Sequence, residues 1–465
     1  MADFWIAGTP AASDDIVTIR SPLDGTVVGE TSNARPDQVE QAVAAAASVF
    51  PSAARLPASA RAAALDHVSA TLARRAGEVA ELITAENGKP AFWAKAEVSR
   101  AVSTFRWAAE EARRFSGEMM RLDTDPAATG RMAVVRRFAR GPVLGITPFN
   151  FPLNLVAHKV APAIAVGAPI LVKPAPATPL TALLLGEILA QTELAAGMFS
   201  ILPLPNDRAS ALVADPRLPV VSFTGSSPVG AQIKAAVPEK HVTLELGGNA
   251  AVLICSDYTD LDWAAQRVAL YSNYQGGQSC IAVQRVFVHS SLADEFTAKL
   301  VEAVSKLDFD AQVGPLISEP AAQKVQQWVD ESGGRVLAGG SRQGTRYEPT
   351  VLTDVPRDAK VVTEEVFGPV LVLSIVDTDD AGFDAINDSN YGLQAGVFTT
   401  DMRTAFKAHT TLNVGGVIIG DVPSYRADPM PYGGAKGSGV GREGLRSAMQ
   451  DYTEARVMVL TGLEL

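Results

Sequence analysis

Cys280 is the residue whose neighbours in the sequence best suit a nucleophile. It follows the glycine-rich, hydroxyl-bearing segment Gln275-Gly276-Gly277-Gln278-Ser279, where backbone N–H groups are free to face the sulfur. Such donors favour both a thiolate and a developing oxyanion. The other cysteine, Cys255, ends the apolar run Ala251-Val252-Leu253-Ile254 and is expected to be a small buried side chain. The polar surroundings of Cys280 therefore make it the better candidate.

Two further side chains have the chemistry that a cysteine nucleophile needs. Glu245 lies between two leucines and is followed by Gly247-Gly248, so burial would raise its pKa towards the range of a general base. The alternative interpretation is that Glu245 is a surface carboxylate at a strand edge. Asn150, in Thr147-Pro148-Phe149-Asn150-Phe151-Pro152, is an N–H donor suited to an oxyanion, and its alternative is simple turn chemistry.

A phosphate-bearing ligand is suggested by two strand ends. Lys173 ends the apolar run Ile170-Leu171-Val172, and the segment from Phe223 to Gly230 is a strand followed by a glycine turn. Free N–H groups at such a turn bind phosphates, although the segment is not a G-x-G-x-x-G fingerprint. The sequence contains no CxxC, HExxH or P-loop pattern, and its five histidines are scattered, so we expect no metal site.

The elements that must position these residues form an α/β pattern. The first 115 residues are expected to be mostly helical, and Asn87-Gly88-Lys89-Pro90 is a helix stop. From about residue 141, short β-branched runs alternate with Ala- and Leu-rich helices, which predicts βαβ units and a parallel sheet. The pattern restarts after about residue 255 and predicts a second α/β lobe. The polar segment Met119–Arg137 suits an extended hairpin.

Composition narrows the class of protein. The 465 residues carry 40 Lys and Arg against 51 Asp and Glu, a net charge of −11, so we expect no nucleic-acid partner. The apolar stretch from 141 to 172 is interrupted by five prolines and by His158 and Lys159, so no membrane association is expected. Two cysteines and the lack of a signal-peptide pattern predict a cytoplasmic protein.

Taken together and in order, eight segments resemble the aldehyde dehydrogenase superfamily. They are Thr147–Pro152, Val172–Ala175, Phe223–Gly230, Glu245–Gly248, Gly276–Cys280, Glu364–Pro369, Asn390–Leu393 and the stretch from Pro431 through Glu443. The resemblance implies an α/β fold with a Rossmann-type nucleotide-binding lobe, an α/β catalytic lobe and a β oligomerisation flap. It divides the chain into residues 1–117 and 138–245 for the NAD(P)-binding domain, 246–425 for the catalytic domain, and 118–137 with 445–465 for the flap. It also implies a homodimer or homotetramer.

The resemblance further implies a role for each matching residue. Cys280 would attack an aldehyde carbonyl, Asn150 and the Cys280 N–H would hold the oxyanion, and Glu245 would activate water against the thioester. The cofactor would be NAD+ or NADP+, because Pro176 stands where many NAD-preferring members have a glutamate. Its contacts would be Thr147, Pro148, Phe149, Lys173, Gly225, Ser226, Leu246, Glu365 and Phe367.

The substrate is expected to be a small polar or anionic aldehyde. By matching outward from the motifs, Arg100, Phe151, His158, Ser279 and Arg426 fall on pocket positions. Two arginines and a histidine around one cavity would suit an anion. The sequence is most similar to the lactaldehyde, sulfoacetaldehyde and phosphonoacetaldehyde dehydrogenase subgroup, although Ser279 replaces an arginine of some phosphonate-handling relatives.

Four other interpretations are weighed against this one. An aromatic or aliphatic aldehyde would be the substrate if the charged residues point away from the pocket. A CoA-acylating semialdehyde dehydrogenase would normally lack the glutamate that is present as Glu245. A non-catalytic scaffold protein would be indicated by the loss of Cys280, Glu245 or Asn150, and all three are present. A cysteine hydrolase would need a histidine near Cys280, which only His158 could supply in space.

Overall fold

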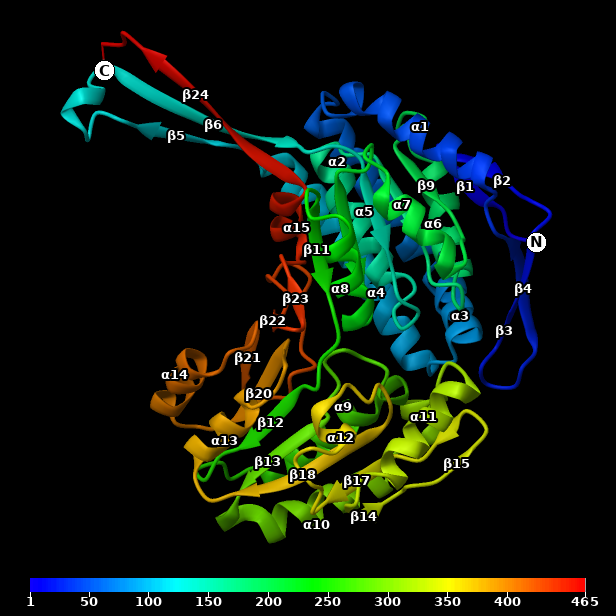
Figure 1. The fold of residues 1–465 in the computed structure, drawn as a ribbon, viewed down its shortest axis with the longest axis vertical. Coiled ribbons are helices and arrows are strands. Elements are labelled where there is room, and N and C mark those ends of the chain that lie inside the picture. Colours follow the sequence, from blue (N-terminus) through cyan, green and yellow to red (C-terminus); the bar gives the residue numbers. More distant parts are fainter. Residues whose placement is uncertain (465) are drawn as a thin grey trace.

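Three larger β-sheets organise the chain, and a computed structural model describes residues 1–464 (Figure 1). Residue 465, the last of the predicted 445–465 segment, lies outside the described residues. No helix among residues 1–464 is both long enough and apolar enough to cross a bilayer.

The first sheet has eight strands, and its central five are parallel. Its strand order is β2 (Thr9–Ala11), β1 (Phe4–Ile6), β9 (Phe199–Ile201), β8 (Ile170–Lys173), β7 (Val143–Ile146), β10 (Val220–Thr224), β11 (His241–Glu245) and β23 (Gly439–Val440). The chain moves from β7 outward to β9 on one side and from β10 to β11 on the other. The gap between β7 and β10 is therefore the topological switch point, where open α/β sheets bind ligands.

Helices cover both faces of this sheet. They are α1 (Pro36–Ala53), α2 (Ala58–Arg74), α3 (Ala76–Asn87), α4 (Ala91–Arg114), α5 (Asn154–Val166), α6 (Leu180–Ala190), α7 (Ala209–Ala214) and α8 (Ser227–Ala236). In α4 the buried residues Ala94, Val98, Ala101, Phe105 and Ala108 recur at spacings of four and three, the period of one helix face. Gly88 ends α3 with φ of +81°, so the predicted helix stop is confirmed.

The second sheet has seven strands and forms the other α/β lobe, at the bottom of Figure 1. Its order is β14 (Arg335–Ala338), β17 (Thr350–Thr353), β18 (Val370–Val376), β13 (Arg285–His289), β12 (Ala251–Ile254), β20 (Gln394–Phe398) and β21 (Gly416–Ile419). All neighbours are parallel except β14 and β17. The accompanying helices are α9 (Leu261–Asn273), α10 (Ala293–Ser305), α11 (Glu319–Asp330), α12 (Lys360–Thr363), α13 (Asp379–Asn387) and α14 (Met402–Thr411).

A third, three-stranded sheet projects from the body as an arm (Figure 1). The hairpin of β5 (Glu118–Arg121) and β6 (Arg131–Ala139) confirms the predicted extended segment, and β24 (Thr453–Thr461) pairs with β6 over nine residues. Helix α15 (Leu445–Asp451) leads into β24. The α/β fold with two lobes and a β arm is thus the predicted one.

Candidate active site

Two adjoining cavities lie at the carboxyl ends of the strands of the first sheet. The smaller, of about 240 Å³, is lined by Cys280, Glu245 and Arg100 among others. The larger, of about 590 Å³, is lined by Lys173 and the turn after β10. Thr224, the last residue of β10, lines both, so the two cavities meet at the switch point of the sheet.

The nucleophile candidate reaches the smaller cavity on a strained loop. Gln275, Gly276 and Gly277 have φ of +44°, +69° and +66°, the left-handed region that favours glycine. A Cβ at Gly277 would lie 2.2 Å from the carbonyl oxygen of Gly368, so this close approach requires glycine. Beyond the turn, the Cys280 Sγ lies 3.1 Å from the Tyr432 Oη.

The thiol of Cys280 is not activated by its loop in the protein alone. Burial, opposed by the Tyr432 hydrogen bond, raises the pKa of Cys280 to about 12. The expectation that the loop favours a thiolate is therefore wrong for the free protein, because desolvation of the sulfur outweighs the nearby donors. A base or a further ligand must assist deprotonation.

Glu245 ends β11 as a buried carboxyl, only 3% exposed. Neither of its oxygens has a hydrogen-bond partner within residues 1–464. Burial first, and then repulsion by Glu443, raises the pKa of Glu245 well above its usual value. The surface-carboxylate alternative is thus wrong. A carboxyl group with a raised pKa and unpartnered oxygens is suited to general-base work.

A buried charge network underlies Glu245, and sequence reasoning did not find it. Lys159 of α5 donates to Glu443 at 3.1 Å and to Thr224 at 2.8 Å, and Arg426 contacts the other oxygen of Glu443 at 3.1 Å. Although burial disfavours the Glu443 charge, Lys159 and Arg426 hold the pKa of Glu443 near 2. The only signals were a lysine within an apolar run and the Gly-Arg-Glu end of a motif.

Asn150 lies in the loop after β7, and a buried ion pair fixes that loop. The Asn150 Nδ2 donates to the Gln278 carbonyl at 2.9 Å, which leaves its second N–H for a ligand. Lys89 donates at 2.6 Å to the Asn150 backbone carbonyl and at 2.6 Å to Glu97. The side chains of Lys89 and Glu97 are both fully buried. Glu97 accepts from the backbone N–H groups of Leu153 and Asn154. This clamp was also missed, because its parts are far apart in sequence.

The small cavity is lined by most of the predicted substrate residues. Arg100, Phe151, Ser279 and Arg426 line it. The Nε atoms of Arg100 and Arg426 are buried and have no partner in the described part of the chain. Tyr274 donates to the Ser279 Oγ at 2.5 Å.

His158 does not line this cavity, so its predicted direct role there is wrong. It belongs to the fully buried helix α5, and its Nε2 lies 3.3 Å from Asp428 Oδ1. Burial, and then Arg426, lowers the pKa of His158 to about 4, so it is neutral at neutral pH and adds no charge to an anion pocket. Its place behind the wall also removes the spatial support for a cysteine hydrolase.

The larger cavity contains most of the residues predicted to contact a dinucleotide. Thr147, Pro148, Phe149, Lys173, Gly225 and Ser226 all line it. Lys173 donates to Asn206 at 2.5 Å, and burial lowers the pKa of Lys173 to about 8. Ser226 precedes α8, whose first N–H groups make a phosphate site. The fit to a dinucleotide is good, because a strand-end turn, a helix N-terminus and a cation converge.

Three predicted cofactor residues lie outside this wall. The Glu365 Oε1 accepts from the Gly248 N–H at 3.1 Å, and burial raises the pKa of Glu365 to about 7. Phe367 stands edge-on to Phe149, with ring centroids 5.8 Å apart. Leu246 lines the small cavity instead and packs against α8 at Gly230. Glu365 and Phe367 thus contact residues of the cavity walls or their loops, but line neither cavity themselves.

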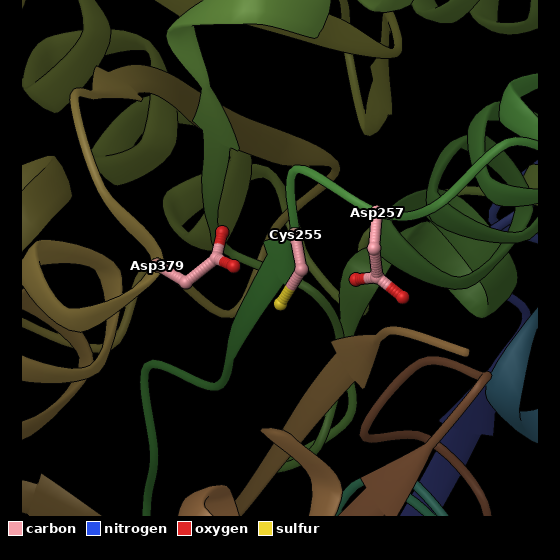
Figure 2. A group of neighbouring side chains, drawn as sticks. All are labelled: Cys255, Asp257 and Asp379. Atoms are coloured by element: carbon pink, nitrogen blue, oxygen red, sulfur yellow. The ribbon is translucent and has the colours of Figure 1, made fainter. Parts of the chain in front are cut away.

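A second cysteine with two carboxylates lies at the end of β12 (Figure 2). Cys255 is fully buried, which confirms the prediction of a small buried side chain. Asp257 accepts from Thr399 and Thr400 and from the N–H of Asp401, and Asp379 accepts from Ser256. Each carboxylate thus has partners that fix a turn, which is a structural arrangement.

The fold and the paired cavities define a dinucleotide-dependent α/β oxidoreductase with a cysteine at its centre. The chain matches the model of the aldehyde dehydrogenase family over residues 9–458. It therefore belongs to the aldehyde dehydrogenase family.

Named relatives and solved structures agree with this membership. The chain is 40% identical over 401 residues to a 3-sulfolactaldehyde dehydrogenase from Priestia aryabhattai, covering 84% of this chain and 83% of the relative. Aldehyde dehydrogenase 21 from Physcomitrella patens, solved with its reaction product succinate, superposes with a TM-score of 0.97 at 43% identity, over 100% of this chain and 98% of that one. An NADP-dependent glyceraldehyde-3-phosphate dehydrogenase from Bacillus halodurans, solved with NADP, gives a TM-score of 0.95 at 32% identity, over 99% of each chain.

Proposed function

We propose that the protein oxidises a small anionic aldehyde to its carboxylic acid with NAD+ or NADP+. The observation that carries the proposal is that two arginines, Arg100 and Arg426, line the cavity that also holds Cys280, and that the buried Nε atom of each has no hydrogen-bond partner among residues 1–464. Buried donors without partners are costly, and a bound anion would satisfy them. One relative is named for sulfolactaldehyde and another was solved with succinate, and both compounds are small anions.

In the first step, a base takes the proton of the Cys280 thiol, and the thiolate attacks the aldehyde carbon to form the tetrahedral thiohemiacetal anion. The free N–H of the Asn150 amide and the Cys280 backbone N–H donate to the oxygen that becomes negative. A dinucleotide held by Lys173, Gly225 and Ser226 would supply the acceptor for the hydride that leaves this carbon. The product on Cys280 is a thioester.

In the second step, Glu245 takes a proton from water, which attacks the thioester carbon and releases the acid and the Cys280 thiolate. The lack of a hydrogen-bond partner at both carboxyl oxygens of Glu245 supports this role. Water acts here where CoA would act in an acylating relative, because a raised-pKa carboxyl group lines the cavity beside the sulfur.

The cofactor cavity is compatible with a 2′-phosphate. No carboxylate lines it among the residues that the structure describes, and Lys173 is its one charged side chain. Pro176, at the position where a glutamate would repel NADP, is part of the same wall. We therefore expect the enzyme to accept both NAD+ and NADP+.

A panel of short aldehydes tests the proposal by the absorbance of the reduced cofactor, with NAD+ and NADP+ in turn. Succinic semialdehyde and sulfonated aldehydes should be preferred to neutral aldehydes of equal length. Arg100→Met should raise KM about tenfold for anionic substrates, the cost of one charge-assisted hydrogen bond, and leave neutral ones unchanged. Arg106→Met, on the exposed face of the same helix, is the matched control. Equal effects of Arg100→Met on both kinds of aldehyde would refute the anion pocket.

We also propose that the arm mediates assembly into a homodimer or homotetramer. Val457, Met458 and Val459 of β24 and Met119 of β5 are 63%, 53%, 49% and 71% exposed. A narrow sheet with apolar residues exposed on both faces needs a partner surface, and a second copy of this chain is the partner that we infer. Light scattering should give a multiple of the 48.8 kDa chain mass, and a monomer would contradict the proposal.

A further inference from the structure

We propose that Tyr432 is a further catalytic residue, whose hydroxyl donates a hydrogen bond to the Cys280 sulfur and stabilises the thiolate. The proposal rests on the proposed function in one respect, the use of Cys280 as nucleophile. It assigns a role to the Tyr432 hydroxyl beyond the roles of Cys280, Glu245 and Asn150.

The contact is short, and the tyrosine that makes it is held on every side. The Tyr432 Oη lies 3.1 Å from the Cys280 Sγ. The Tyr432 backbone exchanges two hydrogen bonds with Glu443, of 2.9 and 2.7 Å. The guanidinium of Arg426 lies 3.9 Å from the centroid of the Tyr432 ring. With only 4% of the residue exposed, the hydroxyl is aimed at the sulfur by its packing.

The other groups around the sulfur do not supply this hydrogen bond. Glu245 and Glu365 oppose a negative charge on Cys280, whereas Arg426 favours it without a direct contact. Tyr274 is close enough to feel the charge of Cys280 but donates to Ser279 instead. Within residues 1–464, Tyr432 is the one hydrogen-bond partner of this sulfur.

The direction of the bond changes with the state of the sulfur. In the neutral thiol either atom can be the donor. After the S–H bond breaks and a base takes the proton, the sulfur can only accept, and Tyr432 keeps its proton and donates. A hydrogen bond to a charged acceptor is stronger than one between neutral groups, so Tyr432 favours the thiolate.

Alkylation of the free enzyme by iodoacetamide tests this without any turnover. An S–C bond forms, iodide leaves, and only the thiolate reacts. We would follow the mass of the Cys280 peptide over a pH series below the thiol pKa. Tyr432→Phe keeps the ring beneath Arg426 and should slow alkylation about tenfold at every pH, equivalent to a rise of about one unit in the pKa of Cys280.

Tyr274→Phe is the matched control, because it removes a hydroxyl that bonds the neighbouring Ser279 and not the sulfur. It should leave the alkylation rate unchanged. An unchanged or faster rate in Tyr432→Phe would overturn the proposal, since the tyrosine would then be idle or an acceptor. Equal slowing by both variants would also overturn it, because it would reflect general loosening of the loop. If Cys280 of the wild-type enzyme alkylates but no aldehyde is oxidised, the proposed function fails while this test still stands.

Discussion

The two cysteines of this chain lie near the same kinds of groups, but the hydrogen bonding of those groups differs. Each lies near two carboxyl groups, Glu245 and Glu365 for Cys280, Asp257 and Asp379 for Cys255. Burial raises the pKa of both thiols. The Cys255 carboxylates have several donors each, whereas Glu245 has none among the described residues.

The two clusters differ in how many buried polar atoms lack a hydrogen-bond partner. Buried polar atoms normally find partners during folding, because an orphaned one costs roughly 1–3 kcal/mol. The Cys255 cluster follows this rule and stabilises a turn. The Cys280 cavity violates it at Glu245 and at the Nε atoms of Arg100 and Arg426, and the side-chain Oδ1 of Asn150, next to the cavity-lining Phe151, is also unpartnered. We expect a bound substrate and water to supply the missing partners.

The largest effect is expected when each cysteine is replaced by alanine, which removes the sulfur. Cys280→Ala should reduce kcat by about 10⁴-fold, as expected when a covalent nucleophile is removed, measured by reduced-cofactor absorbance. Cys255→Ala should keep kcat and lower the free energy of unfolding by about 1 kcal/mol, the cost of a small cavity. Substantial turnover by Cys280→Ala would reverse the assignment of the two clusters.

A second test compares the carboxyl groups. Glu245→Gln should slow steady-state turnover by about 10²- to 10³-fold through loss of the general base. Thioester formation should persist, so a pre-steady-state burst of reduced cofactor should appear in stopped-flow traces. Asp379→Asn is the control in the other cluster and should leave kcat and the traces unchanged. Loss of the burst together with turnover would place Glu245 in the first step instead.

The smallest effect is expected from a substitution of Asp257, in the turn beside Cys255. Although burial opposes it, hydrogen bonds from Thr400, Thr399 and Asp401 hold the pKa of Asp257 below its ordinary 3.8. A carboxylate with a lowered folded-state pKa stabilises the fold above its unfolded pKa, and this contribution disappears as the pH falls. Asp257→Asn should lower the free energy of unfolding by about 1 kcal/mol at neutral pH, and urea titrations should show the gap closing below about pH 4. A gap that is constant with pH would mean that the charge of Asp257 is not involved.

Much of the fold could be predicted because buried parallel strands are short apolar runs. The predicted alternation of short β-branched runs from about residue 141, and its restart after about residue 255, correspond to strands such as β7, β12 and β13. Helix α5 escaped detection, since all thirteen of its residues are buried and no polar face reveals the period. The three-residue strands β1 and β2 are too short to carry a pattern.

The site was predictable only where a motif carries it. Cys280, Glu245 and Asn150 stand in short segments with unusual composition. In the structure Cys280 and Glu245 line one cavity, and Asn150 donates to the carbonyl of Gln278, two residues before Cys280. Lys159 and Glu443 are 284 positions apart, so only the folded chain brings them together. His158 was assigned to the pocket by position, and the helix turns it towards Asp428 instead.

The turn before the nucleophile also restricts how this enzyme can be re-engineered. A single methyl group at position 277 would run into the Gly368 carbonyl, so a mutant library that varies this loop would consist largely of misfolded clones. Tyr425, half exposed at the rim of the same cavity, has no such constraint. Substrate range can therefore be altered by substitutions at the rim, while the segment that positions the Cys280 sulfur must be kept unchanged.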